Sequence, residues 1–295
     1  MATENLRANQ KNKYRALWEF AHGVATVDSI PTMLQIARSN TCNFKCVYCS
    51  DHRVGNDIPR AKLEGETWEK LLALIPRAEW LAFHGISEFM IDPEFFDIVQ
   101  RCANAEATLS INTNGSVCTP KYLDALAAYP GQISMNFSID AATPETFLRI
   151  RGWDFWRVLR NIKTYIERFE ARRNRTWISL SFVVTKSSVG DMLPLVFLAK
   201  ALKVDAVKYY RLHEYDGLDW RIETKIGGSF DYREESTSAF VNEYNLVVEH
   251  TRKAAEMLGL YIELPAPAET PQTIKSNKEA ILEADKEPVL LEASH

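Results

Sequence analysis

Short apolar segments alternate with helical patterns from residue 31 onward, and this alternation constrains the fold more than any other feature of the sequence. Strand-like apolar runs lie at 32–38, 80–84, 107–111, 133–139, 177–184, 206–212 and 261–264. Between them, apolar residues recur at helical spacing over 66–74, 93–103, 120–128, 153–171, 192–202 and 237–258. Repeated strand–helix pairs predict an α/β fold with a parallel sheet. Six such units are too few for a complete eight-stranded barrel.

Three cysteines, Cys42, Cys46 and Cys49, follow the first of these runs at C-x3-C-x2-C spacing. Such close thiols do not suit a disulfide framework, because neighbours would mainly pair with each other. The spacing suits three thiolates that bind one inorganic centre. A zinc ion would need a fourth ligand, for which His52 is the candidate. An iron–sulfur cube held by three cysteines would leave one iron free to bind a small molecule. Three unrelated core cysteines are the remaining alternative.

The cysteine spacing, with Tyr48 before the last cysteine, resembles the radical S-adenosylmethionine (radical SAM) superfamily. The resemblance implies a [4Fe–4S] cluster on Cys42, Cys46 and Cys49, with S-adenosylmethionine on its open iron. It implies that an electron from the cluster cleaves S-adenosylmethionine to a 5′-deoxyadenosyl radical, which takes a hydrogen atom from the substrate. It also implies a partial (β/α)6 TIM barrel over residues 31–265 and an electron donor such as flavodoxin or ferredoxin.

Further candidate site residues follow the strands, where parallel βα folds place their functional loops. After the second strand, residues 85–88 resemble the family's Gly-Gly-Glu motif, which binds the methionine amino group. Gly85 and Glu88 match the motif, whereas Ile86 departs from it and puts the backbone part of that contact in doubt. A simple turn is the alternative. Asn114, after the third strand, lies in a turn that resembles the family's turn beside the cofactor.

Five other residues complete the candidate site. Ser138 and Asp140, at the end of the fourth strand, could present oxygens to the cofactor ribose or could cap a turn. Arg151 lies in a segment that resembles a family signature whose arginine meets the cofactor carboxylate; a surface salt bridge is the alternative. Tyr48 is expected near the adenine. Cys118 could return a hydrogen atom to a substrate radical, as in some radical SAM epimerases, or could be an ordinary buried thiol.

The resemblance therefore predicts an enzyme that abstracts a hydrogen atom from an organic substrate. The candidate substrates are a sugar, a sugar nucleotide or a peptide side chain. No cysteine follows Cys118, so we expect no cysteine-bearing SPASM or twitch extension and no auxiliary cluster. The alternative function is a non-catalytic iron–sulfur or zinc-binding scaffold that keeps the fold, and the altered motif at 85–88 is the feature that favours it.

Composition and charge limit the cellular compartment and the kinds of partner that we expect. The 295 residues carry a formal net charge of −4, which gives no electrostatic reason to expect a nucleic-acid partner. Five cysteines, three of them in one motif, indicate a reducing compartment. No apolar run is long enough to span a bilayer, so we expect a cytoplasmic protein without a membrane partner. We expect a helical extension over 1–30, with a helix at 5–22 packed on the main domain, and a flexible tail over 266–295.

Overall fold

A computed structural model describes residues 6–49, 59–213 and 220–269. Its centre is a seven-stranded parallel sheet in which the strands lie side by side in the order β1-β2-β3-β4-β5-β6-β9. The strands are β1 (Met33–Ile36), β2 (Trp80–Phe83), β3 (Thr108–Thr113), β4 (Ile133–Ser138), β5 (Thr176–Val184), β6 (Ala206–Arg211) and β9 (Tyr261–Glu263). The sheet does not close on itself. The prediction of an α/β fold with an open, partial barrel is confirmed.

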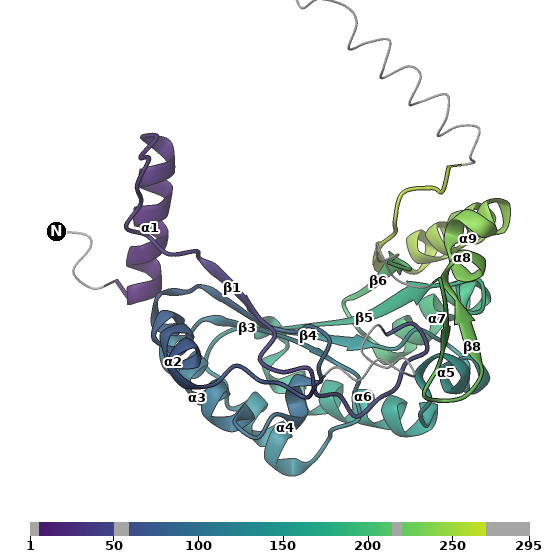
Figure 1. The fold of residues 1–295 in the computed structure, drawn as a ribbon, viewed down its shortest axis with the longest axis horizontal. Helices are drawn as coiled ribbons and strands as arrows, with labels where there is room; N and C mark the ends of the chain where they lie inside the picture. Colours follow the sequence, from purple (N-terminus) through teal and green to yellow (C-terminus); the bar gives the residue numbers. More distant parts are fainter. Residues whose placement is uncertain (1–5, 50–58, 214–219, 270–295) are drawn as a thin grey trace, which may run out of the picture.

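Helices follow the strands and cover one face of the sheet. They are α2 (Gly65–Leu74), α3 (Phe95–Ala105), α4 (Pro120–Ala127), α5 (Pro144–Arg151), α6 (Phe155–Phe169), α7 (Met192–Leu202) and α9 (Val241–Leu258), with short 3-10 turns at Ile75–Arg77, Phe89–Ile91, Glu170–Arg175, Val189–Asp191 and Thr237–Ala239. Figure 1 shows helices along the convex side of a curved sheet. The concave side carries no helical layer within the described residues.

The sequence explains why the helices pack on this side. Alternate residues of each strand point toward the helices, and those of β4, such as Met135 and Phe137, are fully buried. In α6, six apolar residues recur at helical spacing and are buried against the strands: Phe155, Val158, Ile162, Tyr165, Ile166 and Phe169. Asp154 caps this helix, since its carboxylate accepts the backbone N–H of Arg157 at 3.0 Å. One continuous core therefore joins sheet and helices.

Two segments are more regular than the sequence predicted. The region read as a loop at 214–235 contains an antiparallel hairpin, β7 (Arg221–Glu223) and β8 (Ser229–Asp231), and a short helix α8 (Tyr232–Glu235); residues 214–219 lie outside the described residues. The helix α5 was not expected from periodicity. It begins after Thr143 with Pro144 in its first turn and ends at Gly152, whose φ of +66° suits glycine.

The N-terminal helix α1 (Ala8–Ala21) packs on the domain by its polar side, whereas the apolar pattern predicted the opposite. Asn9 donates to the carbonyl of Ala105, and Asn12 exchanges two hydrogen bonds with the backbone of Ile30. Both asparagines are buried, while the large apolar side chains Tyr14, Leu17, Trp18 and Phe20 are more than half exposed. The buried amides satisfy backbone groups that an apolar face would leave unpaired.

The end of the described chain also packs more than a tail would. Ala268 is buried, and its backbone N–H and C=O both bond to the side chain of Asn245 on α9, at 2.9 and 3.1 Å. Residues 270–295, which make up most of the predicted tail, lie outside the described residues. None of the described helices is long and apolar enough to cross a membrane.

Candidate functional site

A pocket of about 280 Å³ lies where the chain leaves the C-terminal ends of the strands. Every candidate ligand of the cluster and the cofactor lines it: Cys42, Cys46, Cys49, Tyr48, Gly85, Glu88, Asn114, Ser138 and Arg151. These residues come from the loops after β1, β2 and β3, from the last residue of β4 and from α5. A parallel sheet brings these loops to one edge, which explains how distant segments converge here.

The cysteine loop is fixed by packing on both sides. Phe44 is 1% exposed and stacks on Trp153, with ring centroids 4.9 Å apart. The backbone N–H of Val47 donates to the carbonyl of Ile150 at the end of α5, at 3.0 Å. Burial raises the pKa of the Cys42 thiol to about 11. Such a thiol is a poor nucleophile at neutral pH but loses its proton when it binds a metal centre.

Glu88 is a buried carboxylate that ties the second loop to the third. Its oxygens accept the backbone N–H of Asn114 at 2.6 Å, the hydroxyl of Thr113 at 2.9 Å and the backbone N–H of Met90 at 3.1 Å. Burial raises the pKa of Glu88 above its usual value, against the effect of these three donors. A carboxylate offers about four acceptor positions, so one remains for a ligand.

Gly85 is needed for close packing as well as for access. A Cβ at Gly85 would lie 2.7 Å from the Cβ of Ala37, which follows β1. Glycine at this position lets the loops after β1 and β2 touch. Ile86, the departure from the family motif, also lines the pocket and is 45% exposed. The turn and the ligand-binding interpretations of this segment are therefore both compatible with its geometry.

Asn114 connects Glu88 to the first cysteine. Its side-chain N–H₂ donates to Asn43 at 2.9 Å and lies 3.9 Å from the sulfur of Cys42. Its side-chain oxygen accepts the backbone N–H of Ser116 at 2.9 Å. The amide is thus fixed with its donor side toward the thiol, which favours a negatively charged sulfur.

Arg151 is engaged by the protein on three sides. Its Nη1 donates to the sulfur of Cys46 at 3.1 Å, its Nε lies 2.8 Å from Oδ2 of Asp140, and its Nη2 donates to the carbonyl of Ser138. Only 7% of Arg151 is exposed. The nitrogens expected to form a fork toward a cofactor carboxylate are therefore engaged by Asp140, Cys46 and Ser138, and the guanidinium places its charge beside a cysteine sulfur.

Asp140 is a site residue that the sequence interpretation underrated. It is 1% exposed, and besides Arg151 it accepts the hydroxyl of Tyr48 and the backbone N–H of Val183 at 2.7 Å. Its φ of 53° is a left-handed conformation that Asp tolerates better than most residues. Its position directly after β4 was the available signal. One carboxylate thus holds the arginine and the tyrosine that flank the cysteines.

Ser138 and Cys118 have different placements. The hydroxyl of Ser138 accepts a hydrogen bond from Ser181 at 3.3 Å, and Ser138 lines the wall of the pocket. Cys118 does not line it; its sulfur lies 3.9 Å from the carbonyl of Asn161 on α6. The structure therefore does not bring Cys118 to the pocket, and its role in hydrogen transfer stays a prediction.

The β7–β8 hairpin covers the cysteine loop. The hydroxyl of Tyr232 donates to the carbonyl of Tyr48 at 2.8 Å, and Phe230 packs on the Tyr48 ring. At the hairpin turn, Ile226 approaches Gly152 so closely that a Cβ there would lie 2.6 Å from it. The hairpin and Tyr48 share a small apolar cluster, which holds the hairpin against the cysteine loop.

The donor set suits a cluster held by thiolates. Three thiols face one pocket, with the Arg151 guanidinium and the Asn114 amide directed at two of the sulfurs. No three His, Cys, Asp or Glu side chains within 6–49, 59–213 and 220–269 converge as the ligands of a single metal ion would. His52, the proposed fourth ligand of the zinc alternative, lies outside the described residues.

A larger cavity of about 870 Å³ opens on the concave side of the sheet and adjoins the pocket. The two share Asn112, Ser138, Ser181 and Val183 as lining residues. The sequence interpretation missed this cavity. The signal was the period-two alternation of β4, ISMNFS, which indicates a strand with one polar, open face.

Comparisons with known proteins agree with this arrangement. The sequence model of the radical SAM superfamily matches residues 36–181. The chain is 33% identical over 129 residues to a GTP 3′,8-cyclase of Crocosphaera subtropica, which covers 40% of this chain and 36% of that protein. It is 26% identical over 204 residues to molybdenum cofactor biosynthesis protein 1 of Bos taurus, covering 65% and 30%. The chain thus spans about a third of the length of these curated relatives.

A solved structure shares the fold. The crystal structure of Streptococcus suis SuiB bound to S-adenosylmethionine superposes with a TM-score of 0.61 at 17% sequence identity. The alignment covers 87% of this chain and 54% of SuiB. At this level of identity the likeness shows the fold alone.

Proposed function

The chain belongs to the radical SAM superfamily, and we propose that it is an enzyme that binds a [4Fe–4S] cluster and S-adenosylmethionine. The observation that carries the proposal is the convergence of all the predicted ligands on one pocket at the C-terminal edge of the sheet. Cys42, Cys46 and Cys49 would hold the cluster. When bound, the cluster supplies the electron that cleaves S-adenosylmethionine to a 5′-deoxyadenosyl radical, which abstracts a hydrogen atom from the substrate.

The surrounding side chains prepare the pocket for these charges. Arg151 stabilises the thiolate of Cys46 through a charge-assisted contact, and Asp140 holds the guanidinium in place. The free acceptor position of Glu88 would bind the methionine ammonium. Tyr48, held between Asp140 and the hairpin, would lie along the adenine.

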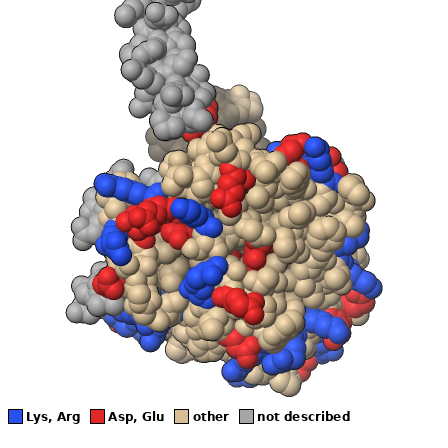
Figure 2. Space-filling model, turned by 90° about the vertical axis from the view of Figure 1, so that its right-hand side faces the viewer, with Lys and Arg blue, Asp and Glu red and all other residues tan. Residues whose placement is uncertain are grey.

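We propose an organic small molecule or a peptide as the substrate and a small electron-transfer protein, such as flavodoxin or ferredoxin, as the reductant. On the face drawn in Figure 2, acidic and basic side chains are interspersed within the described residues. The described residues of this face form no basic stripe, and the formal net charge of −4 gives no electrostatic reason to expect binding of nucleic-acid phosphates. We therefore keep the expectation that nucleic acid is not a partner.

A second candidate substrate is a guanosine nucleotide. The similarity to a GTP 3′,8-cyclase over 129 residues favours it. The test is direct: reconstituted protein is incubated with GTP, reductant and S-adenosylmethionine, and loss of GTP is measured by liquid chromatography. Turnover of GTP would establish this candidate, and unchanged GTP would remove it.

The main test is anaerobic reconstitution followed by iron analysis and an assay for 5′-deoxyadenosine. We expect about four irons per chain and reductant-dependent 5′-deoxyadenosine. Alanine in place of Cys42, Cys46 or Cys49 should abolish the iron. Alanine in place of Cys102 is the matched control, because Cys102 is buried in the core away from the pocket. This variant should keep the iron content of the wild type.

Two outcomes would contradict the proposal. Iron without 5′-deoxyadenosine under reducing conditions would favour the non-catalytic scaffold. Stoichiometric zinc that survives reconstitution with iron would favour the zinc alternative.

A further inference from the structure

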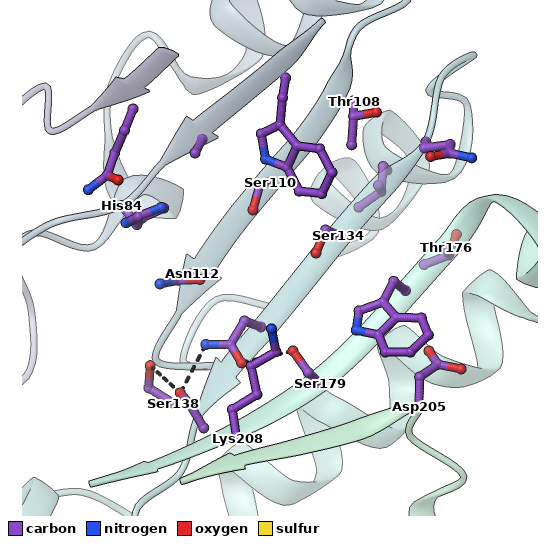
Figure 3. A pocket seen from close by; sticks show the side chains of 18 of the residues that line it. His84, Thr108, Ser110, Asn112, Ser134, Ser138, Thr176, Ser179, Asp205 and Lys208 are labelled. Carbon is purple, nitrogen blue, oxygen red and sulfur yellow. Dashed lines mark hydrogen bonds between the residues drawn. The ribbon is translucent and has the colours of Figure 1, made fainter. Parts of the chain in front are cut away.

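Short neutral polar side chains line the concave face of the sheet. They lie on neighbouring strands: Gln35 on β1, Ser110 and Asn112 on β3, Ser134, Asn136 and Ser138 on β4, and Ser179 and Ser181 on β5. Figure 3 shows Ser110, Asn112 and Ser134 on adjoining strands, with His84 beside them. Closed barrels fill such positions with bulky branched residues. Here the same positions form the wall of a cavity of about 870 Å³, a volume typical of ligand sites.

Part of this wall has unused hydrogen-bonding capacity. Asn136 is satisfied by Ser179 and Ser181, at 2.9 Å each. In contrast, Ser110, Asn112 and Ser134 make no side-chain hydrogen bond to any described residue, as Gln35 and His84 also do not. Donors and acceptors therefore point into the cavity without protein partners. A ligand with many hydroxyl or amide groups would satisfy them.

Two tryptophans stand at the other end of the same wall. Trp80 and Trp177 line the cavity and are 39% and 43% exposed. Trp80 is the first residue of β2 and Trp177 the second of β5. They lie four residues before His84 and Ser181, which is about 13 Å along a strand. Ser181 also lines the cysteine pocket. A ligand that stacks on an indole and reaches this shared wall must be longer than one sugar ring.

The charges of the cavity do not suit a triphosphate. Among its described lining residues, Lys208 is paired with Glu263 at 3.1 Å and Arg173 with Asp205 at 2.8 Å. Arg175 donates to the carbonyl of Pro130 at 3.1 Å. Burial lowers the pKa of His84, so its ring is neutral at pH 7. Recognition of phosphates uses arginine and lysine clusters that are free to contact them.

We propose that this cavity binds an uncharged saccharide of at least two rings, with one ring on Trp80 or Trp177 and another against the wall shared with the cysteine pocket. The unpartnered groups of Ser110, Asn112 and Ser134 would bind its hydroxyls. This inference rests on the proposed function for the reaction and names its substrate class.

The test is saturation-transfer NMR on the anaerobically reconstituted full-length protein with S-adenosylmethionine present. The probes are maltotriose, cellotriose and chitotriose, each compared with GTP and with a short Ser- and Asn-rich peptide at equal concentration. At least one trisaccharide should bind about tenfold more tightly than GTP or the peptide.

Variants locate the binding. Trp80→Leu and Trp177→Leu should each weaken the binding of that trisaccharide several-fold, and Ser110→Val with Ser134→Val together about tenfold. Trp156→Leu is the matched control, because Trp156 is also an exposed tryptophan, at 56%, but lies on α6 outside the cavity. Iron content and melting temperature report whether each variant is folded.

Each possible result either supports or overturns the saccharide inference. Tighter binding of GTP or of the peptide, no binding of any trisaccharide, or equal effects of the Trp156 and Trp80 variants would overturn the saccharide inference. Because binding is measured without turnover, saccharide binding in a protein that makes no 5′-deoxyadenosine would support this inference and contradict only the proposed reaction.

Discussion

The two faces of the seven-stranded sheet are built from the same strands but have opposite chemistry. In β4, Ile133, Met135 and Phe137 point to the helices and are almost completely buried, whereas Ser134 and Asn136 face the cavity. The side-chain period of two places neighbours in sequence on opposite faces. The difference shows that packing against the helices constrains the residues of the outer face, whereas the residues of the inner face can be selected for binding a ligand.

The largest effect on stability is expected when a polar residue replaces an apolar one on the helix side of a strand. Ile111 is fully buried on the helix side of β3, and Ser110 lines the cavity. Ile111→Ser should lower the free energy of unfolding by about 4 kcal/mol, because it leaves a cavity and buries an unpaired hydroxyl. Denaturant unfolding of the metal-free protein measures it.

The neighbouring variant is the control. Ser110→Ile should change the free energy of unfolding by no more than about 0.5 kcal/mol, since its side chain faces open space. Similar losses in both variants would show that the inner face is as tightly packed as the outer one.

The next effect on stability is expected at the C-terminal edge of the sheet, where the loops of the cysteine pocket lie. Arg151→Met leaves the carboxylate of Asp140 buried without its cation and should cost about 3 kcal/mol of unfolding free energy in the metal-free protein. Adding Asp140→Asn removes that uncompensated charge and should restore part of the loss. A double variant less stable than the sum of the two single variants would contradict the pairing.

A smaller effect is expected at α1, where the usual arrangement of polar and apolar residues is reversed. Asn12→Ala should cost about 1–2 kcal/mol, because it leaves the backbone groups of Ile30 without partners. Trp18→Ser, on the exposed side, should change stability by less than about 0.5 kcal/mol. Thermal unfolding at one protein concentration measures both, and a larger loss for the Trp18 variant would mean that the apolar side is the packed one.

The smallest effect concerns the pH dependence of the inner face. Burial lowers the pKa of His84 below its ordinary value of 6.5, so the folded state favours the neutral ring. Its contribution to stability is present above pH 6.5 and is lost as the pH falls through the lower folded-state pKa. Between about pH 7.5 and about pH 5.5 the wild type should lose slightly more stability than His84→Gln. An identical loss in both proteins would place His84 in an environment like water.

Much of the fold could be predicted because its signals are local. Each predicted strand lies within a few residues of an observed one, since apolar runs and helical periodicity depend on nearby residues only. The hairpin and α5 were missed because their segments lack such a pattern; the hairpin and the α8 helix after it are held by contacts of Phe230 and Tyr232 with the distant Tyr48. In the site, the cysteine spacing predicted the position, but the pairing of Arg151 with Asp140 and Cys46 joins residues far apart in the chain.

By itself the sequence determined the parallel α/β order, the cysteine loop and the family resemblance, because each of these is written in short stretches of residues. Only the tertiary structure decided which face of α1 is buried, which groups Arg151 and Glu88 contact, and that the inner face of the sheet is an open polar cavity. These features depend on which distant segments meet, and the burial and hydrogen bonding that select among those meetings act only once the chain has folded.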